Sequence, residues 1–449
     1  MVSDDGGWAI PHATSREHFT SMIASGLNRA LKERLGISTR MLRQMHSRHD
    51  PTSRETHVVC LMELRADRWR PPAGMRWVDA AAFHGLPLAR PEQGPVLRAW
   101  FDEANGACAP TARAPWALPH WHPAADAWIL EELGFRGVAI TGSIEQIRCG
   151  PMSAILRVPT ADGMAYFKAS PEAFAHETPL TAALSRLYPD RSPRVIATDH
   201  DRGWMLMADI GGTALRRVAD VTRWEGALRL YAETQMQLVG RREELDAVGC
   251  PRRTLDTLAE EVGPLLADTD ALTFDGAEPG LSSAELRRLR GLAPRLKEAC
   301  RALAAYRVPH TLTHGDFVAV NIAMTDAGYV FFDWAHSSVA HPFFDFQWVL
   351  PQPAAGGPSD FYAIPFTSRT LSQLTDAYLT PWTVYEPMAR LRQALDLAQP
   401  LGALHHAVTF HRYVVPRVAD AADWRSSVPR LLRGALAHEA ALSSLSPGS

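Results

Sequence analysis

The sequence predicts an α+β protein in which an antiparallel sheet near the middle of the chain precedes a mainly helical region. Between residues 144 and 207, short runs of alternating apolar and polar residues are separated by turn residues, which is typical of half-buried antiparallel strands. From residue 222 onward, long segments carry apolar residues at helical spacing. Residues 1–105 combine helix and strand patterns of their own, so we expect an extra N-terminal α/β domain.

Length and composition are compatible with several globular domains. The chain has 449 residues, 46% of them hydrophobic, which is enough for two or three domains and a large core. We expect an N-terminal appendage over residues 1–105, a linker over 106–123, a sheet-bearing lobe over 124–209 and a helical lobe over 210–445.

The charge balance excludes some classes of partner. The 46 basic and 49 acidic residues give a net charge of −3, so no overall field attracts nucleic acid or an anionic membrane. No apolar run approaches the roughly 18 residues that span a bilayer, and the acidic N-terminus lacks a signal-peptide core. The five cysteines lie apart without metal spacing: Cys60, Cys108, Cys149, Cys250 and Cys300. We therefore expect a cytoplasmic protein with no membrane partner; the oligomeric state is unknown from the sequence.

Four elements are expected in the N-terminal domain: a helix over residues 16–35, a strand over 56–64, a strand edge over 76–83 and a helix over 91–103. The segment from Asn28 to Gly36 faintly resembles the second half of the Nudix hydrolase box. Glu33 and Gly36 match that box, but Ala30 and Arg34 stand where metal-binding glutamates belong. The resemblance implies a degenerate domain that serves as a scaffold or substrate cap. The alternative is a plain α/β appendage.

The predicted linker is rich in proline and tryptophan. Residues 107–123 contain four prolines and two tryptophans, and because proline fixes φ we expect a stiff or docked connection. Trp116, Trp121 and Trp128 are expected to bury against the sheet-bearing lobe. An aromatic cage for a cationic substrate is the alternative use of such residues.

Three strands are predicted over residues 144–148, 153–158 and 164–169, followed by an amphipathic helix over 174–187. Lys168 lies in the third strand, and Glu177 lies in the first turns of the helix. A lysine that holds nucleotide phosphates must be oriented, and an ion pair with a helix glutamate nine residues later achieves this. The alternative is a solvated lysine and a surface glutamate, which is the usual situation of both residue types.

Two further strands are predicted over residues 194–197 and 204–207, and Ala208-Asp209-Ile210-Gly211-Gly212 follows them. An apolar strand that ends in a glycine-rich crossover suits a hinge whose backbone binds the adenine edge. Met207 would pack on the base and Asp209 would lie beside it. The alternative is that the methionines of this strand are ordinary core residues.

The most informative motif lies near residue 316. Asp316 precedes Asn321 by five residues, and Asp333 follows Asn321 by twelve. A strand over 308–313, a loop and a hairpin with its turn at Thr325–Gly328 would bring these three side chains to one edge. An aspartate that accepts the proton of an attacking hydroxyl, with an asparagine and a second aspartate as Mg²⁺ ligands, is the arrangement of a phosphoryl-transfer site. The alternative is an ordinary turn and an ordinary strand-end carboxylate.

These residues together resemble the aminoglycoside phosphotransferase/choline kinase-like family of small-molecule kinases, over about residues 120–420. The matching residues are His314, Gly315, Asp316, Asn321, Asp333, Trp334, Lys168, Glu177 and the block His341–Asp345. The resemblance implies a bilobal protein-kinase-like fold, ATP as donor, Mg²⁺ as cofactor and a small-molecule hydroxyl as acceptor. It implies Asp316 as base, Asn321 and Asp333 as metal ligands, and Lys168 with its partner Glu177 on the phosphates. His314 and Asp345 would support the catalytic loop by hydrogen bonds.

The sequence departs from protein kinases at three places and from the resembled family at a fourth, His341. Gly315 stands where protein kinases carry the arginine that answers a phosphorylated activation loop, which favours a constitutively competent small-molecule kinase. The phosphate-covering loop from Arg148 to Ser153 has one glycine and a proline, although Ser153 offers a hydroxyl. Trp334 and Ala335 replace the Phe-Gly pair, and His341 occupies a place where the family often has glycine. We interpret His341 as a packed histidine.

The helical lobe is expected to contain helices over residues 222–239, 255–267, 283–306, 371–378, 388–397, 401–414 and 428–443. The acceptor is expected between the catalytic loop and the helices after Asp345. Candidate lining residues are His336, Gln347, Asp360, Tyr362, His405, His406 and His411. No dense acidic cluster of the kind that favours a polycationic aminoglycoside is present. Histidines at this density on one apolar helix are more often packed than functional.

Two other classes of protein remain open at this point. A pseudokinase that senses nucleotide without turnover would keep the fold, but every polar group that transfer needs is present. A protein kinase is disfavoured by Gly315 and by the lack of an Ala-Pro-Glu motif after Asp333. The sequence therefore predicts a small-molecule phosphotransferase of unknown acceptor.

Overall fold

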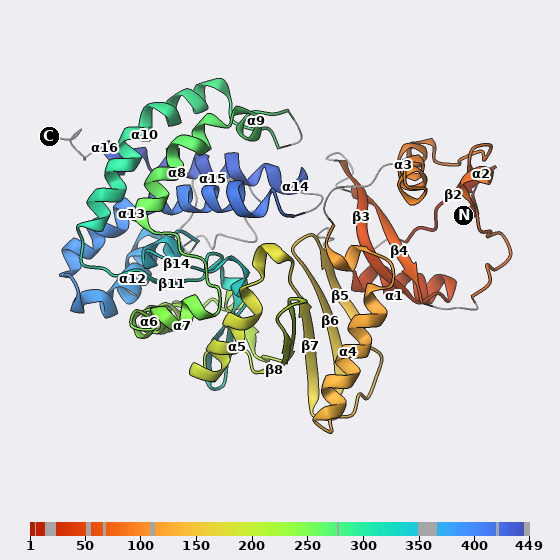
Figure 1. Ribbon diagram of the computed structural model, residues 1–449, viewed down its shortest axis with the longest axis horizontal. Helices are drawn as coiled ribbons and strands as arrows, with labels where there is room; N and C mark the ends of the chain where they lie inside the picture. The colour runs from red at the N-terminus through yellow and green to blue at the C-terminus, as the bar shows by residue number, and fades with distance from the viewer. Residues whose placement is uncertain are drawn as a thin grey trace. The chain divides into compact units, whose positions relative to one another are not determined.

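The computed structural model describes residues 1–4, 6–13, 24–50, 55–65, 69–107, 113–275, 278–348, 366–418 and 422–443 (Figure 1). Contacts divide the chain into two compact units, Met1–Pro171 and Glu172–Ser449. The boundary between them falls inside the range expected for the sheet-bearing lobe, and the expected domain limits stay a prediction. No helix in the described ranges is both long and apolar enough to cross a membrane.

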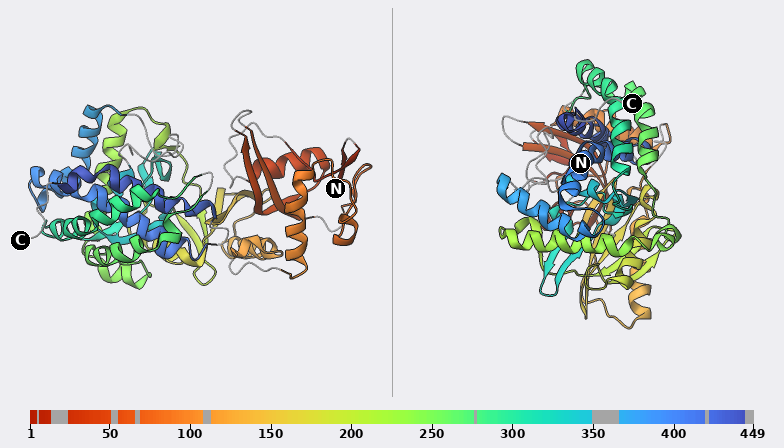
Figure 2. Two further views of the ribbon diagram at one scale, coloured as in Figure 1. Left: turned by 90° about the horizontal axis from the view of Figure 1, so that it is seen from above. Right: turned by 90° about the vertical axis from the view of Figure 1, so that its left-hand side faces the viewer.

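The first unit begins with a long two-stranded ribbon and its flanking helices. In chain order its first elements are β1 (Val2–Asp4), β2 (Gly7–Ala9), α1 (Ser25–Leu35), β3 (Thr39–Asp50), β4 (Glu55–Leu64), α2 (Ala80–Phe83), η1 (Pro91–Gln93) and α3 (Gly94–Ala104). Strands β3 and β4 are antiparallel, and α1 packs on β3 (Figure 2). The strand expected over 56–64 is confirmed, whereas β3 was not anticipated because its alternation is interrupted by two bulges.

Gly36 has a local structural explanation. It ends α1 in the left-handed conformation with φ of 65°, and its N–H donates to Lys32 O, as a helix C-cap requires. Gly36 is one of the two residues that match the Nudix box. Because the end of α1 requires a glycine there in any case, this match is not evidence for a Nudix domain. The Nudix resemblance is otherwise unsupported.

A helix begins inside the segment that we expected to be the linker. The short turn η2 (Pro115–Ala117) precedes α4 (Trp121–Phe135). Trp116 is buried and donates from Nε1 to Gly150 O over 2.8 Å, and Trp128 is buried with its ring 5.7 Å from Phe167. The expected burial is therefore confirmed for Trp116 and Trp128, while Trp121 is half-buried, and the described part of the connection is docked.

The first unit ends in three antiparallel strands, β5 (Glu145–Gly150), β6 (Ser153–Thr160) and β7 (Gly163–Ala169). Tight turns after Gly150 and Thr160 join them. The second and third strands match the predicted ranges within two residues, because alternating burial along β6 and β7 follows the alternation of the sequence.

The second unit opens with the remaining strands of the α+β pattern and their connections. These are η3 (Glu172–Phe174), α5 (Glu177–Leu187), β8 (Val195–Asp199), β9 (Trp204–Ala208), β10 (Thr213–Ala214) and η4 (Leu215–Arg217). Strands β8 and β9 form an antiparallel hairpin. Farther along the chain lie β11 (Thr311–Thr313), η5 (Ala319–Asn321), β12 (Ile322–Thr325), β13 (Gly328–Phe331), η6 (Trp334–His336), β14 (Ser338–Ala340) and η7 (Pro342–Trp348). The order β10-β12-β13 forms one small sheet, and β11 pairs with β14.

Helices make up most of the second unit, as predicted. They are α6 (Val221–Leu238), α7 (Arg242–Ala247), α8 (Leu255–Ala267), α9 (Thr269–Leu272), α10 (Ser283–Ala304), α12 (Ser368–Leu379), η8 (Thr380–Val384), α13 (Met388–Thr409), η9 (Phe410–Val414), α14 (Ala422–Arg425), α15 (Ser427–Ala437) and α16 (Glu439–Ser443). Helices α8 and α10 pack together, and α13 contacts both of them and α15 (Figure 1).

Two helix predictions are wrong in detail. We expected separate helices over 388–397 and 401–414, but α13 runs continuously through Pro400. Proline removes one hydrogen bond from a helix interior, and here the almost complete burial of the helix around Pro400 outweighs that loss. The single helix expected over 428–443 is instead divided at His438 into α15 and α16.

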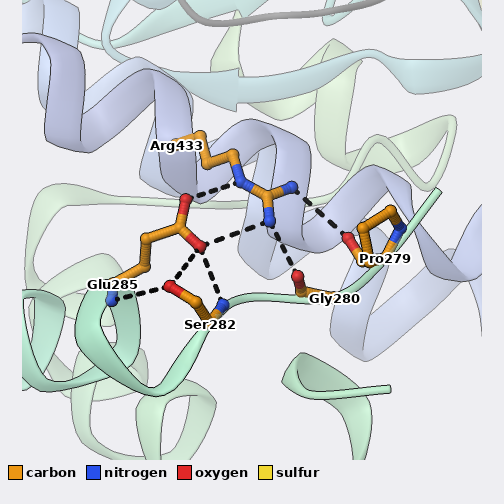
Figure 3. Close-up of polar contacts among 5 residues, drawn as sticks. All are labelled: Pro279, Gly280, Ser282, Glu285 and Arg433. Carbon is orange, nitrogen blue, oxygen red and sulfur yellow. Dashed lines mark hydrogen bonds and ion pairs between the residues drawn. The ribbon is translucent and has the colours of Figure 1, made fainter. Parts of the chain in front are cut away.

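A capping box fixes the start of α10 (Figure 3). Ser282 Oγ accepts from the N–H of Glu285, and the Glu285 carboxylate accepts from the N–H of Ser282. Arg433 from α15 donates to the same carboxylate over 2.8 Å and to Gly280 O. The side-chain bond with Arg433 is the main reason that the pKa of Glu285 is lowered to about 2. This cluster ties two helices that are distant in sequence.

Candidate active site

The segment that carries Asp316 follows strand β11 and is held by one buried carboxylate. Asp345, on η7, is fully buried. Its Oδ2 accepts from the N–H of His314 and its Oδ1 from the N–H of Gly315, each over 2.8 Å. The two bonds fix the backbone of the loop just before Asp316.

Helix α6 completes the surroundings of this carboxylate. Tyr231 donates its hydroxyl to Asp345 Oδ2 over 2.5 Å, and Gln235 Nε2 lies 3.4 Å from the same oxygen. Tyr378 of α12 donates to Gln235 Oε1 over 2.8 Å. Sequence reasoning missed Tyr231, Gln235 and Tyr378, since they lie on helices far from the motif and carry no local signal.

Burial dominates the titration of this carboxylate. It raises the pKa of Asp345 to about 6, against the opposing effect of the bonds from Tyr231 and from the two loop N–H groups. Burial and the nearby Asp345 charge likewise raise the pKa of Tyr231 well above its usual value, so this tyrosine stays a donor.

Position 315 accepts only glycine. Gly315 has a φ of +76°, and an added Cβ would lie 2.1 Å from the backbone oxygen of His336. Any side chain would force the loop away from η6. The arginine of protein kinases therefore has no place at this position.

His314 bridges the loop and the following hairpin. Its Nε2 lies 2.9 Å from Phe332 O, and its Nδ1 accepts from the N–H of Asp316 over 3.4 Å. These partners select the tautomer that carries its hydrogen on Nε2. The ring also packs on Trp334, with centroids 4.6 Å apart.

The structure brings Asp316 and Asn321 together. Asn321 Nδ2 donates to the backbone oxygen of Asp316 over 3.0 Å and to its Oδ2 over 3.1 Å. The N–H of Phe332 donates to Asn321 O over 3.1 Å, which brings the end of β13, and so Asp333, beside Asn321. The predicted hairpin is present, with Thr325 opposite Gly328.

Asp333 has an unusual backbone conformation. With a φ of 69° it is one of two described non-glycine residues with positive φ, the other being His120. Such a conformation is costly for an L-residue and tends to occur at functional sites. Within the described ranges, no three His, Cys, Asp or Glu residues lie together as a metal cluster. Asn321 and Asp333 instead offer an amide oxygen and a carboxylate, which suit a Mg²⁺ ion that also binds phosphates.

The predicted hinge connects β9 to the small sheet whose strand β12 begins directly after Asn321. Met207 is half-buried near the end of β9. Asp209 is exposed, and its Oδ1 accepts from the N–H of Gly211 over 3.1 Å. Gly212 has a φ of +73°, and a Cβ there would lie 2.1 Å from Met324 O, so this crossover requires glycine.

The remaining predicted nucleotide ligands are placed within their own units. In the first unit, Ser153 begins β6 opposite Gly150, and Lys168 lies on β7 opposite Ile155; both side chains are buried. In the second unit, Glu177 is the first residue of α5 and is buried. The ion pair between Lys168 and Glu177 stays a prediction.

The candidate acceptor residues differ in their surroundings. His405 and His406 are buried in α13, and burial lowers the pKa of each, that of His406 to about 3. His411 pairs with Asp268 over 2.9 Å. His336 stacks on Phe410 with centroids 5.6 Å apart. Asp360, Tyr362 and the side chain of Gln347 lie outside the described part of the chain.

His341 is a packed histidine, as we interpreted it. It is fully buried, its Nδ1 accepts from the N–H of Phe343, and its ring lies against Phe343 and Phe344. Burial lowers its pKa well below the usual value.

The chain belongs to the phosphotransferase enzyme family (APH), whose sequence profile matches residues 148–391. This membership confirms the predicted protein-kinase-like α+β fold. No curated protein matches the chain in sequence.

Several solved structures are similar to this chain. The GDP and kanamycin complex of APH(2")-IIia is 15% identical, with a TM-score of 0.47, and covers 70% of this chain and 98% of its own. A macrolide 2'-phosphotransferase from Brachybacterium faecium is 16% identical, with a TM-score of 0.44, and covers 68% and 97%. A choline kinase from Cryptosporidium parvum is 10% identical, with a TM-score of 0.46, and covers 66% and 89%. We take no substrate from likenesses this distant.

Proposed function

We propose that this protein transfers the γ-phosphoryl group of ATP, with Mg²⁺, to a hydroxyl of a small molecule. The observation that carries the proposal is the loop and hairpin geometry around Asn321. Its amide bonds to the Asp316 carboxylate, and its backbone bonds to the strand that delivers Asp333. Membership of the phosphotransferase enzyme family supports the reaction class.

Each polar group of the loop has a role in this proposal. Asp316 accepts the proton of the acceptor hydroxyl, and the amide of Asn321 fixes the rotation of its carboxylate. The Asn321 amide oxygen and the Asp333 carboxylate would hold Mg²⁺. When bound, Mg²⁺ neutralises the charge of the nucleotide phosphates. His314 and Asp345 are positioning residues that act on the backbone of the loop.

Several residues named by the sequence motif would hold the nucleotide. Lys168, oriented by Glu177, would bind the phosphates, and the backbone and Ser153 hydroxyl of the β5–β6 turn would cover them. The backbone of the segment from Met207 to Asp209 would meet the adenine edge, with Met207 against the ring. These roles are inferred from the sequence motif and from membership of the family.

The acceptor would be a small molecule rather than a protein. The contact between position 315 and His336 O leaves no room for the arginine that couples protein kinases to an activation loop. Autophosphorylation on added ATP would contradict this part of the proposal.

The test compares wild type with Asp316→Asn in transfer of labelled γ-phosphate from Mg-ATP to pooled hydroxyl metabolites and antibiotics. We expect turnover to fall by about 10²–10⁴-fold in the variant, because the general base is lost, with nucleotide binding largely kept. Dividing the pool would identify the acceptor. Equal turnover of both proteins would rule out Asp316 as the base.

A second measurement separates a kinase from a nucleotide sensor. Stabilisation by Mg-ATP without any labelled product, across pools that cover anionic, neutral and cationic acceptors, would indicate a sensor. In Asp333→Ala we expect the Mg²⁺ dependence of nucleotide binding to weaken; unchanged dependence would count against Asp333 as a ligand. Removing residues 1–105 would show whether the appendage contributes to turnover.

A further inference from the structure

Arg253 is a half-buried cation with few partners among the residues that the structure describes. Its NH1 donates to Thr409 Oγ1 over 2.8 Å, its guanidinium lies 4.8 Å from the Tyr413 ring centroid, and its buried Nε has no partner. Among the acidic residues that the structure describes, none pairs with it. A guanidinium has five N–H donors, and the described residues provide one hydrogen-bond acceptor for it.

Two histidines near Arg253, His176 and His406, are kept in their neutral form. Burial first, and then the charge of Arg253, lower the pKa of His176 to about 4. Burial, and then the charges of His336 and Arg253, lower that of His406 to about 3. His176 is only 8% exposed, and its Nε2 has no hydrogen-bond partner in the described ranges. The cluster therefore contains a cation and an unsatisfied ring nitrogen in one place.

A rare helix form lies against the same guanidinium. Residues Phe410–Val414 form a π-helix, and the N–H of Val415 donates to Phe410 O, five residues back. Such segments are rare and often mark functional sites. This one places Tyr413 against Arg253 and also against Arg417, whose guanidinium lies 5.7 Å from the same ring centroid. Two positive groups thus share one aromatic ring.

Arg253 is also close to the catalytic loop. Its N–H donates to Val339 O on β14, and β14 pairs with β11, the strand that leads to Asp316. Two inter-strand spacings separate its backbone from β11, roughly 10 Å. His336, whose backbone touches Gly315, stacks on Phe410 of the π-helix.

We propose that Arg253, with His176 and the π-helix residue Tyr413, forms a subsite for an anionic group of the acceptor, a carboxylate or a phosphate. The inference rests on the proposed kinase function and narrows its substrate class: the acceptor is a hydroxyl compound that also carries an oxyanion. The oxyanion pairs with the Arg253 fork, while the hydroxyl lies toward Asp316.

The first test measures binding without turnover. The full chain is saturated with Mg-ADP at fixed ionic strength, and thermal unfolding is followed with D- or L-glycerate, glycerol 3-phosphate, glycerol and ethanolamine as probes. We expect at least one of the anions to raise the unfolding temperature, and glycerol and ethanolamine not to. The glycerate and phosphate arms separate the two anion types. No shift with any anion, or equal shifts with all probes, would overturn the proposal.

Matched variants locate the effect. Arg253→Gln should abolish the shift and Arg253→Lys should keep part of it, because lysine retains the charge without the bidentate fork. Arg412→Gln is the control, since Arg412 lies on the same π-helix but is exposed and pairs with Glu261 over 3.1 Å. It should keep the full shift. If Arg253→Gln does not fold, Arg253→Lys carries the test, and an unchanged shift in that variant would overturn the subsite.

Turnover distinguishes failure of the subsite from failure of the kinase. For an anionic acceptor, Arg253→Gln should raise KM about 10- to 100-fold, the loss of a charged hydrogen bond, with a smaller change in kcat. Arg253-dependent anion binding without transfer to any acceptor would support the subsite and contradict the kinase. Transfer to a neutral or cationic acceptor with an unchanged KM in Arg253→Gln would support the kinase and overturn the subsite.

Discussion

Two arginines, one in each unit, show how differently a desolvated charge can be treated: Arg40 is buried and Arg253 is half-buried. Arg40 in the first unit donates to Ile144 O over 2.8 Å and lies 3.5 Å from Asp126, which also binds Arg65. Arg253 in the second unit has a hydroxyl and an aromatic ring instead. Burial lowers the pKa of both arginines to about 10. Among the residues that the structure describes, a carboxylate offsets this desolvation for Arg40 and none does so for Arg253.

The difference separates a structural charge from one available to a ligand. A buried ion whose partner belongs to the fold holds that fold together, and removing either partner leaves an uncompensated charge. A buried ion without such a partner lowers stability until an ion of opposite charge binds. Arg40 is a charge paired within the fold, whereas Arg253 is a charge without such a partner among the described residues. The three predictions below test this contrast, beginning with the largest expected effect.

The largest effect is expected for Arg40→Met. This change leaves Arg65 as the remaining described ion-pair partner of Asp126. The free energy of unfolding of the first unit should therefore fall by about 3 kcal/mol. Denaturant unfolding with a probe in each unit measures it, because two units need not unfold in one transition. The exposed Arg301→Gln, which breaks a surface pair with Glu298, is the control and should change stability by less than about 0.5 kcal/mol. If Arg40→Met changes the free energy of unfolding as little as Arg301→Gln does, the contrast between Arg40 and Arg253 does not hold.

The next effect concerns the buried charge of opposite sign, Asp345. Its pKa is raised to about 6 in the folded state, so between about pH 4 and pH 6 the folded state binds more protons than the unfolded state. Stability from this group is therefore full below that window and is lost as pH rises through it, by up to about 1.4 kcal/mol per pH unit.

The difference in unfolding free energy between wild type and Asp345→Asn isolates this term, because the variant cannot titrate at this position. Relative to the variant, wild type should lose stability from pH 4 to pH 6. If wild type gains stability instead, the four donors around the carboxylate outweigh its desolvation, and Asp345 resembles the well-compensated Arg40.

The smallest effect has the opposite sign. Arg253→Met removes a half-buried charge that no described carboxylate compensates and keeps most of the side-chain volume, so the ligand-free protein should gain about 1 kcal/mol. The measurement is the unfolding transition of the second unit, beside Arg40→Met in the first. A loss as large as that of Arg40→Met would mean that a fold partner compensates Arg253 and that its charge is structural.

Local patterns predicted the hairpin of the candidate site well. The hairpin between Asn321 and Asp333 depends on a four-residue turn and on alternating strands, which are contained within about twenty residues of sequence. Its geometry could therefore be predicted without knowledge of any distant contact. The same applies to β6, β7 and most helices of the second unit.

The sequence by itself determined the α+β class, the family and the residues of the loop and hairpin, because these depend on periodicity and short-range spacing. Only the tertiary structure decided what surrounds Asp345, since Tyr231 and Gln235 come from a helix about a hundred residues away. It also decided that Pro400 lies inside a helix, through burial that no local pattern shows. In sequence Arg253 stands in a polar turn beside Arg252 and has the pattern of a solvated residue. Its lack of a described acidic partner depends on which helices pack around it. Packing of that kind is set by the whole fold, whereas periodicity can be seen in a short stretch of sequence.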